Sequence, residues 1–431
     1  MSKEIKLTQI SGPASPNLPA AQPNQPRFAQ EALVAACPNP GAAPQASLAT
    51  SLYIHIPFCF HKCHYCDFYS IVDTRDRQEV FTTRLESELR ALAPYATKPL
   101  HTIFIGGGTP TLLRPELWHR VLRVLHENYQ INADTEFTVE ANPETVTLEL
   151  MQLLRSGGVN RISMGAQSFN KSHLKTLERW HDPDNIPRAL EHARSAGIHR
   201  LSLDLIYAIP NQTLAEWDAD LRRALALNTD HLSCYTLTYE PNTAMTMRLK
   251  QGQFQRADED LEADMFEHTV RTLREHNLDR YEVSNFARPT QQCQHNLAYW
   301  RQHNWLAAGP SASAHMNGHR WKNTPRLDDY LTKSTNGFSA ITDFEPADER
   351  RNLGEYLWTS LRTTEGINLQ RVETSIAQLQ DSSIQARINK QLERHQSLKN
   401  LTTTNTTVQL TDQGFMIADS IAVDLLAAID E

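Results

Sequence analysis

The sequence predicts an α/β fold: a partial barrel of six β/α units, followed by a smaller, mostly helical domain that resembles a winged helix. Two observations predict this fold. Six short β-rich runs alternate with helical patterns between residues 51 and 290, and the alternation stops after about residue 290. In addition, residues 1–50 hold 8 of the 22 prolines and little charge. We therefore expect three segments, 1–50, 51–290 and 291–431.

The six predicted strands are rich in β-branched and aromatic residues, and they are Leu52–Ile56, Thr102–Ile105, Glu136–Glu140, Asn160–Met164, Leu201–Ile206 and His231–Thr236. The helical patterns between them cover 76–93, 114–129, 145–156, 184–196, 214–227 and 257–276. Such alternation predicts parallel strands, with the functional groups at their carboxyl ends. A seventh run, Arg280–Asn285, is expected to extend the sheet. The runs are too short to show whether the barrel closes.

The last third of the chain follows a different pattern. Residues 346–362 and 383–397 are expected to be helices, and Leu398–Leu410 is a threonine-rich hairpin. Thr411 then caps a final apolar helix that reaches Ala428. Because this domain has no basic stripe, we expect a lid or docking module and not a DNA-binding domain.

Residues 1–50 are predicted to be a disordered, proline- and alanine-rich extension, because this composition buries too little surface to offset the entropy of ordering. The segment lacks the apolar core of a secretion signal and has too few arginines for a typical transit peptide. With six cysteines and no export signal, the chain is expected in a reducing compartment, the cytoplasm.

Composition narrows the classes of function. Apolar residues make up 40% and charged residues 21% of the chain, and the formal net charge is −8. A negative net charge argues against a dedicated nucleic-acid binder, whereas a small anionic ligand needs only a local basic pocket. No apolar run approaches the ~20 residues of a membrane span, so we do not expect a transmembrane protein.

Three cysteines lie within eight residues directly after the first predicted strand: Cys59, Cys63 and Cys66. A Cys-x3-Cys-x2-Cys loop offers three thiolates to a [4Fe–4S] cluster and leaves one iron open for a further ligand. Aromatic side chains in the loop are expected to exclude water from the cluster, and they are Phe58, Phe60, Tyr65, Phe68 and Tyr69. The alternative is a structural zinc site in which His61 or His64 is the fourth ligand.

A glycine turn, Gly106–Thr111 (Gly-Gly-Gly-Thr-Pro-Thr), ends the second predicted strand. Glycines let the backbone approach a ligand closely. Following the cysteine loop by one β/α unit, this turn resembles that of the radical S-adenosylmethionine (SAM) superfamily. More narrowly, residues 51–430 resemble the oxygen-independent coproporphyrinogen III oxidase family. The resemblance implies that SAM chelates the open iron, and that an electron from the cluster cleaves SAM to a 5′-deoxyadenosyl radical.

The resemblance also implies a set of SAM-binding residues at successive strand ends: Tyr53, Tyr65, Phe68, Gly107, Gly108, Thr109, Glu140, Gln167, Arg179, Asp204 and Thr238. The glycine turn and Glu140 are expected to hold the methionyl end, and the Arg179 guanidinium suits its carboxylate. Gln167 and Asp204 suit the ribose hydroxyls. Tyr65 and Thr238 are expected on the adenine side.

Phe68 separates two branches of the family. The oxidases carry a further cysteine two residues after the third cysteine of the loop, where this chain has Phe68. A phenylalanine here resembles the HemW branch, whose members are similar to haem chaperones. This departure speaks against an oxidative decarboxylase.

A second motif, His295-Asn-Leu-Ala-Tyr299-Trp300, resembles a haem-associated motif of the same branch. His295 is expected as an axial iron ligand, with Tyr299, Trp300 and Trp305 against the porphyrin face. The alternative is a packed aromatic turn between domains with a structural histidine. The family's next motif places a histidine at position 313, which is a serine here, and whether His315 replaces it is left open.

Together these features predict a haem chaperone that binds haem, a [4Fe–4S] cluster and SAM, and that transfers haem to an acceptor protein. A membrane-bound respiratory protein is one candidate acceptor, and a second copy of the chain is a candidate partner. The first alternative is an oxygen-independent coproporphyrinogen III oxidase. A radical methyltransferase-like enzyme with another substrate is the second.

Overall fold

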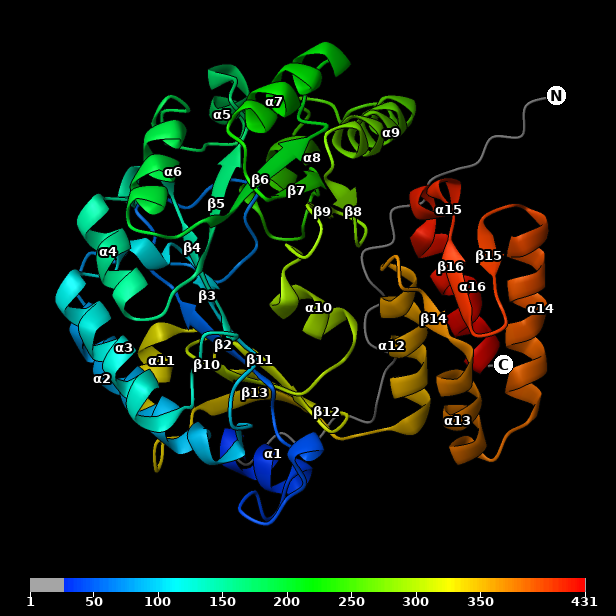
Figure 1. Cartoon of the computed structure of the whole chain (residues 1–431), viewed down its shortest axis with the longest axis horizontal. Coiled ribbons are helices and arrows are strands. Elements are labelled where there is room, and N and C mark those ends of the chain that lie inside the picture. The colour runs from blue at the N-terminus through cyan, green and yellow to red at the C-terminus, as the bar shows by residue number, and fades with distance from the viewer. Residues whose placement is uncertain (1–26, 431) are drawn as a thin grey trace.

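The structure, a computed structural model, describes residues 27–430 of the 431-residue chain. Its main body is a curved thirteen-stranded sheet, in which the six strands β2 to β7 are parallel and follow one another in chain order. Helices cover the convex face of this sheet (Figure 1). The α/β class, the partial barrel of six β/α units and the smaller, mostly helical C-terminal part are confirmed.

The parallel strands lie close to their predicted positions: β2 Ser51–Ile56, β3 Thr102–Gly107, β4 Glu136–Ala141, β5 Arg161–Gln167, β6 Arg200–Tyr207 and β7 His231–Thr236. The six predicted helices are α2 Gln78–Leu92, α3 Pro115–Asn128, α4 Leu148–Ser156, α6 Asn185–Ser195, α7 Leu214–Ala226 and α9 Glu259–Glu275. Two short helices, α5 Lys171–Thr176 and α8 Ala244–Lys250, were not predicted, because each is too brief to show a helical period.

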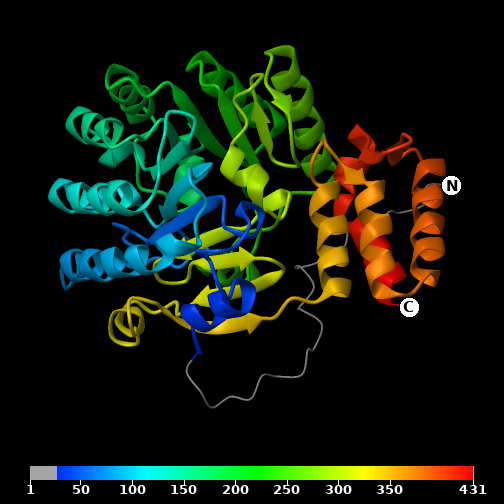
Figure 2. The ribbon, with the colours of Figure 1, turned by 60° about the horizontal axis from the view of Figure 1, so that its bottom comes forward.

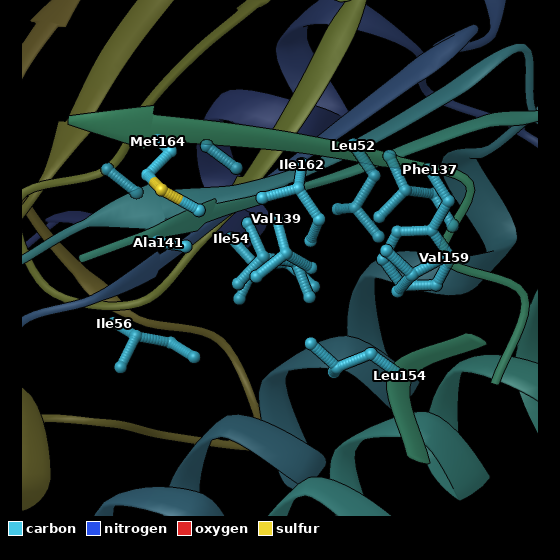
Figure 3. Close-up of a cluster of buried hydrophobic side chains, with 14 of the residues drawn as sticks. Leu52, Ile54, Ile56, Phe137, Val139, Ala141, Leu154, Val159, Ile162 and Met164 are labelled. Atoms are coloured by element: carbon cyan, nitrogen blue, oxygen red, sulfur yellow. The ribbon is translucent and has the colours of Figure 1, made fainter. Parts of the chain in front are cut away.

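The two faces of the sheet differ in polarity, because side chains alternate along each strand. On the convex face, Leu52, Ile54 and Val139 are fully buried beside Leu154 of α4 (Figure 3). Burial of such side chains contributes roughly 1.5–3 kcal/mol each and holds the helices to the sheet. The concave face carries the alternate residues, including Glu140, so the interior of the partial barrel is polar.

The seventh predicted strand, Arg280–Asn285, is not one strand. The chain forms β8 Asp279–Arg280 and β9 Asn285–Ala287, which pair antiparallel with each other. β9 adds to the edge of the sheet against β7, also antiparallel. The run does extend the sheet, but a tight turn within it reverses the chain.

The predicted domain boundary at residue 290 is wrong, because strands that follow this residue form the opposite edge of the sheet. Here β10 Trp305–Ala308 pairs parallel with β2, and β11 Ser313–Met316, β12 His319–Asn323 and β13 Ala340–Glu345 continue antiparallel. The short helix α11 Leu327–Thr332 lies between the last two strands. The boundary was misplaced because these strands no longer alternate with long helices.

A buried carboxylate ties this edge to the helix layer. Glu88 of α2 is fully buried and accepts four hydrogen bonds, from the Asn323 side chain (3.1 Å), Gly309 N (3.0 Å), the Tyr330 hydroxyl (2.6 Å) and the Ser339 hydroxyl. The donors come from residues 309–339, so these hydrogen bonds fix that segment to α2. Removing the buried carboxylate would leave the donors unsatisfied, which is costly.

Residues 27–50 correct the prediction of a disordered extension. The strand β1 Arg27–Phe28 pairs with β13, and helix α1 Ala29–Ala36 packs on β12 and β13. Leu33 is fully buried there. Small alanines let α1 lie close to the sheet, a packing role that composition alone does not reveal. Residues 1–26 lie outside the described residues.

The C-terminal part is a separate hydrophobic body beside the barrel (Figure 2). Its elements are α12 Glu349–Leu361, β14 Ile367–Asn368, α13 Leu369–Leu379, α14 Ser383–Ser397, β15 Leu401–Thr403, β16 Thr407–Leu410, α15 Asp412–Met416 and α16 Ala418–Asp430. The Thr411 hydroxyl accepts from Gly414 N (3.0 Å) as a cap, but the predicted final helix is divided at Ile417. Nowhere between residues 27 and 430 is a helix long and apolar enough to span a bilayer.

Candidate cofactor site and the aromatic helix

The predicted SAM-binding residues come from the carboxyl ends of neighbouring strands. The cysteine loop leaves β2, the glycine turn ends β3, and Glu140, Gln167 and Asp204 lie at or near the ends of β4, β5 and β6. Arg179 follows α5, in the loop before α6. In a parallel sheet these ends meet at one edge, so topology alone gathers residues that are far apart in the sequence.

The backbone fixes the start of the cysteine loop. Cys59 N donates to Ile71 O (2.8 Å) and Ile71 N donates to Pro57 O (2.8 Å), so the loop is closed at its base. Within the loop, Cys66 N donates to Cys63 O (3.3 Å). All three cysteines are free and partly buried. They are therefore available as ligands and held on one short segment.

The aromatic shell differs from the prediction. Phe58 is buried at 2% exposure, and Tyr65 and Tyr69 are partly buried. In contrast, Phe60 and Phe68 are 71% and 64% exposed. Phe60 nevertheless lines one hollow together with Cys59 and another together with Cys63.

The thiols of Cys59 and Cys63 contact one residue of the glycine turn and one residue of the loop that follows α5. Cys59 Sγ lies 3.6 Å from Thr109 Oγ1 in the glycine turn, and Cys63 Sγ lies 3.8 Å from Arg179 Nη1. Burial raises the pKa of Cys66 to about 11 and also raises the pKa of Cys59. Such thiols stay protonated until a metal displaces the proton.

The glycine turn is packed too tightly for any side chain at its centre. Gly107 has φ +112°, and a Cβ at Gly108 would lie 2.7 Å from Phe58 O. Gly107 N donates to Glu140 Oε2 (3.0 Å). The turn thus brings exposed backbone, the cysteine loop and the Glu140 carboxylate together.

Two carboxylates face the barrel interior. Burial, together with the nearby Asp204, raises the pKa of Glu140 to about 7. Burial also raises the pKa of Asp204, although Ser163 Oγ donates to both of its oxygens (3.2 and 3.3 Å). Because water no longer solvates them, these carboxylates favour a cationic or hydroxyl-rich ligand.

Arg179 and Gln167 gather at the end of β5. Arg179 Nη2 donates to Gly165 O (2.9 Å), and a Cβ on Gly165 would lie 3.0 Å from that nitrogen and 2.7 Å from Gln167 Nε2. Gln167 itself has φ +63°. The end of β5 therefore lies against the Arg179 guanidinium, which comes from the loop after α5.

Of the remaining predicted SAM residues, Tyr65 reaches the cysteine loop, because its side chain is hydrogen-bonded to Cys63. Tyr53 donates to or accepts from His55 Nδ1 (3.0 Å) and stacks on Phe104, below the strand ends. Tyr65 packs in a small apolar cluster with α8. Thr238 and Phe68 are exposed on loops, and the Phe68 backbone is hydrogen-bonded to Cys66.

The aromatic motif forms helix α10, Gln294–Trp300, on the concave side of the sheet near the amino ends of the strands (Figure 1). Glu136 of β4 caps this helix, because its carboxylate accepts from Gln294 N (3.1 Å) and His295 N (2.9 Å). The same carboxylate accepts from Arg200 Nη2 (2.8 Å). Sequence reasoning missed Glu136, which carries no motif of its own.

His295 does not offer a free nitrogen to iron. Its Nδ1 is hydrogen-bonded to Thr102 Oγ1 (2.7 Å) and its Nε2 to the Tyr299 hydroxyl (2.9 Å), and the residue is 1% exposed. Burial lowers the pKa of His295 to about 3. This arrangement fits the alternative, a packed aromatic turn, and the axial role of His295 stays a prediction. The ring of Tyr299 packs on Trp305, whereas Trp300 Nε1 is buried without a partner among residues 27–430.

At position 313, where the family's motif has a histidine, this chain has a serine. Ser313 is exposed at the start of β11. His315 is buried, its Nδ1 is bonded to His303 O (3.1 Å), and its ring packs on Trp305. His315 therefore takes part in the packing around the aromatic turn.

Three hollows lie at or near the cysteine loop. Two have a volume of about 250 Å³ each, and Phe58, Cys59 and Phe60 are among the residues that line one of them. The other is lined by Phe60, His61, Cys63, Thr109, Asn142, Glu144, Arg179 and Trp180. A larger one, about 560 Å³, shares Glu144, Arg179 and Trp180 with it. The exposed Trp180 ring stacks on His61 at 4.1 Å. Sequence analysis missed Trp180 and His181, although both directly follow Arg179.

Comparison with known proteins places this site in a family. The Radical SAM superfamily model matches residues 53–224. The haem chaperone HemW of Lactococcus lactis subsp. lactis (strain IL1403) is 32% identical over 375 residues, which cover 86% of this chain and 96% of that protein. This chain belongs to the HemW family. HemW of Escherichia coli (strain K12) is 40% identical over 264 residues, covering 61% of this chain and 69% of that protein.

The HemW family shares its fold with a solved enzyme. Coproporphyrinogen III oxidase (HemN) from Escherichia coli, a radical SAM enzyme, matches with a TM-score of 0.78 at 25% identity. The match covers 92% of this chain and 93% of that one, so it includes the C-terminal body. The predicted family is confirmed.

Membership in the HemW family of radical SAM proteins implies a [4Fe–4S] cluster and SAM, and the residues present fit both. Three free thiols on one loop supply the ligands of the cluster. The tight glycine turn, Glu140 and Arg179 suit the polar end of SAM.

Proposed function

We propose that this protein is a haem chaperone, which binds haem and transfers it to an acceptor protein, and which carries a [4Fe–4S] cluster and SAM. The observation that carries the proposal is the 32% identity to a protein named haem chaperone HemW over 96% of that protein's length. The exposed Phe68, where the oxidases are expected to have a cysteine, supports it.

The cofactor site of the proposal is built from the strand ends. Cys59, Cys63 and Cys66 ligate the cluster, which supplies one-electron reduction of SAM when both are bound. The remaining predicted SAM residues bind and orient that molecule: Tyr53, Tyr65, Phe68, Gly107, Gly108, Thr109, Glu140, Gln167, Arg179, Asp204 and Thr238. Phe68 and Thr238 must approach from exposed loops.

The charges of Glu140, Asp204 and Arg179 indicate which part of SAM each side chain binds in this proposal. Glu140 takes the ammonium group, because its pKa of about 7 leaves it readily ionised beside a cation. Asp204 takes the ribose hydroxyls, with Ser163 holding it in place. Arg179→Ala removes a charge-assisted pair to the carboxylate, which we expect to cost on the order of 2–4 kcal/mol, or ~30- to 1000-fold in SAM affinity.

Haem is the cargo, and Tyr299 and Trp300 are our candidates for contact with the porphyrin. Trp300 has a buried N–H without a partner in the described structure, so it retains bonding capacity. To act as the axial ligand, His295 would first have to release Thr102 or Tyr299. As the haem acceptor we propose a membrane-bound respiratory protein. We also propose that the chain pairs with a second copy of itself and that it is located in the cytoplasm.

A second function is favoured by one observation, the TM-score of 0.78 to coproporphyrinogen III oxidase. The test is anaerobic reconstitution of the full chain, followed by two assays on the same sample. We expect saturable haem binding, seen as a Soret band, and no conversion of coproporphyrinogen with SAM and a reductant. Robust conversion without haem binding would establish the oxidase instead.

A further inference from the structure

Arg179 connects the cysteine loop to the end of β5 through three separate nitrogens. Nη1 lies 3.8 Å from Cys63 Sγ, Nη2 donates to Gly165 O (2.9 Å), and Nε donates to His181 Nδ1 (3.2 Å). A guanidinium is planar, so two fixed nitrogens determine where the third one points. Gly165 and His181 therefore aim Nη1 at the sulfur.

The hydrogen bond from Arg179 defines the state of His181. Arg179 Nε can only donate, so His181 Nδ1 accepts and its proton is on Nε2. His181 is 8% exposed, and burial together with the Arg179 charge lowers its pKa to about 3. The ring is thus neutral near pH 7. Its Nε2 has no hydrogen-bond partner in the described part of the chain, so the bond to Arg179 is its one specific contact of this kind.

The local chain provides room for this arrangement. A Cβ at Gly165 would lie 3.0 Å from Arg179 Nη2, so only a glycine lets the guanidinium reach the Gly165 carbonyl without a shift. His181 is two residues beyond Arg179. Gly165 and His181 therefore both hold the Arg179 guanidinium in place.

We propose that His181 is a positioning residue that holds Arg179 as a hydrogen-bond donor to the Cys63 sulfur, and that this contact raises the reduction potential of the cluster. The inference rests on the cofactor site of the proposed function, and it adds a second task for Arg179 besides binding a carboxylate. Reduction adds one electron to the cluster and breaks no bond. A positive donor at a ligand sulfur stabilises the extra negative charge.

The test compares variants of His181 in the reconstituted full chain. His181→Phe keeps a ring but removes the acceptor, whereas His181→Asn places an oxygen close to the position of Nδ1. We expect His181→Phe to lower the equilibrium constant for one-electron reduction about tenfold, a shift of about 59 mV to more negative potential. His181→Asn should restore most of the wild-type potential. Redox-poised electron paramagnetic resonance of the cluster measures both, without SAM or haem.

Trp180→Phe is the matched control, because Trp180 adjoins both residues but is 68% exposed, and its contacts are a stacked His61 ring and a hydrogen bond from Nε1 to Glu178 Oε2 (3.2 Å). Its potential should equal that of the wild type. An unchanged potential in His181→Phe, or an equal fall in Trp180→Phe, overturns the proposal. If His181→Phe does not assemble a cluster, His181→Gln takes its place in the test, because the glutamine oxygen lies too far from Arg179 Nε to accept its hydrogen bond. Equal reduction potentials for His181→Asn and His181→Gln would then overturn the proposal.

The outcome is separable from the proposed function. If the wild type forms a cluster but binds no haem, the haem chaperone proposal fails and the assignment of His181 is unaffected. If the wild type forms no cluster, the cofactor site itself is wrong, and the assignment of His181 fails with it.

Discussion

The two ends of strand β4 use a glutamate in opposite ways. At the amino end, Glu136 accepts from Gln294 N, His295 N and Arg200, and although burial alone would raise its pKa, Arg161, Arg200 and these backbone groups hold the pKa below its ordinary value. At the carboxyl end, Glu140 accepts from Gly107 N, and its pKa is raised to about 7. A fully paired carboxylate fastens the fold, whereas an incompletely paired one has capacity left for a ligand.

The same difference separates the two motifs that the sequence singles out. The thiols of the cysteine loop form no disulfide, and their contacts with Thr109 and Arg179 are long ones to sulfur, 3.6 and 3.8 Å. In α10, both nitrogens of His295 are already bonded. Both motifs combine a metal-ligating residue with aromatic side chains, so residue types alone do not distinguish a site from packing. The hydrogen-bond partners do.

Loss of the cluster is the largest effect we expect. Cys63→Ala removes one of three thiolate ligands and should abolish the absorption near ~400 nm that is typical of such clusters. Cys234→Ala, at a buried strand thiol, is the control and should retain that absorption. Full iron and sulfide content in the Cys63 variant would place the cluster elsewhere.

The same substitution at the two ends of β4 should have opposite effects on stability. Glu136→Gln replaces a buried charge that is paired with Arg200 and two backbone N–H groups, so we expect a loss of ~3–5 kcal/mol in the free energy of unfolding. Glu140→Gln should cost little or stabilise the protein, while weakening SAM affinity. Denaturant titration and equilibrium SAM binding measure these quantities. Equal destabilisation by both changes would contradict the contrast.

His295→Ala should be a stability variant and not a haem-ligand variant. It leaves Thr102 and Tyr299 without their partner and opens a cavity under α10, for which we expect ~2–4 kcal/mol of destabilisation. The Soret position of bound haem and the cluster absorption should stay unchanged, as absorption spectra of the reconstituted variant will show. A shifted or missing Soret band in a folded sample would restore His295 as the axial ligand.

The smallest effect concerns pH. Because the folded-state pKa of Glu140 is raised above its unfolded value, the folded chain binds the proton more tightly between the two values. Stability should therefore fall as pH rises from about 4.5 to about 7, and Glu140→Gln should remove this part of the slope. Glu282 also has a pKa of about 7 and contributes to the same slope. The quantity to measure is therefore the difference between the stability-against-pH curves of the wild type and of Glu140→Gln. Coincident slopes would show that Glu140 does not titrate in this range.

Strand positions could be predicted, and a candidate cofactor site could be proposed, because the sequence signals for both are local. Buried strands are short apolar runs, and the cysteine loop and the glycine turn are contiguous motifs. The role of α10 could not be predicted, since it depends on Glu136 and Thr102, which are more than 150 residues away in the sequence. The prediction for residues 27–50 was wrong for a related reason. Helix α1 packs on β12 and β13, which lie far away in the sequence, and composition does not show that contact.

The most direct test of the account is a haem titration of the anaerobically reconstituted wild type, with iron, sulfide and coproporphyrinogen conversion measured on the same sample. The account predicts a [4Fe–4S] cluster, a saturable Soret band and no conversion. A sample that carries the cluster and converts coproporphyrinogen robustly, but binds no haem, would contradict it.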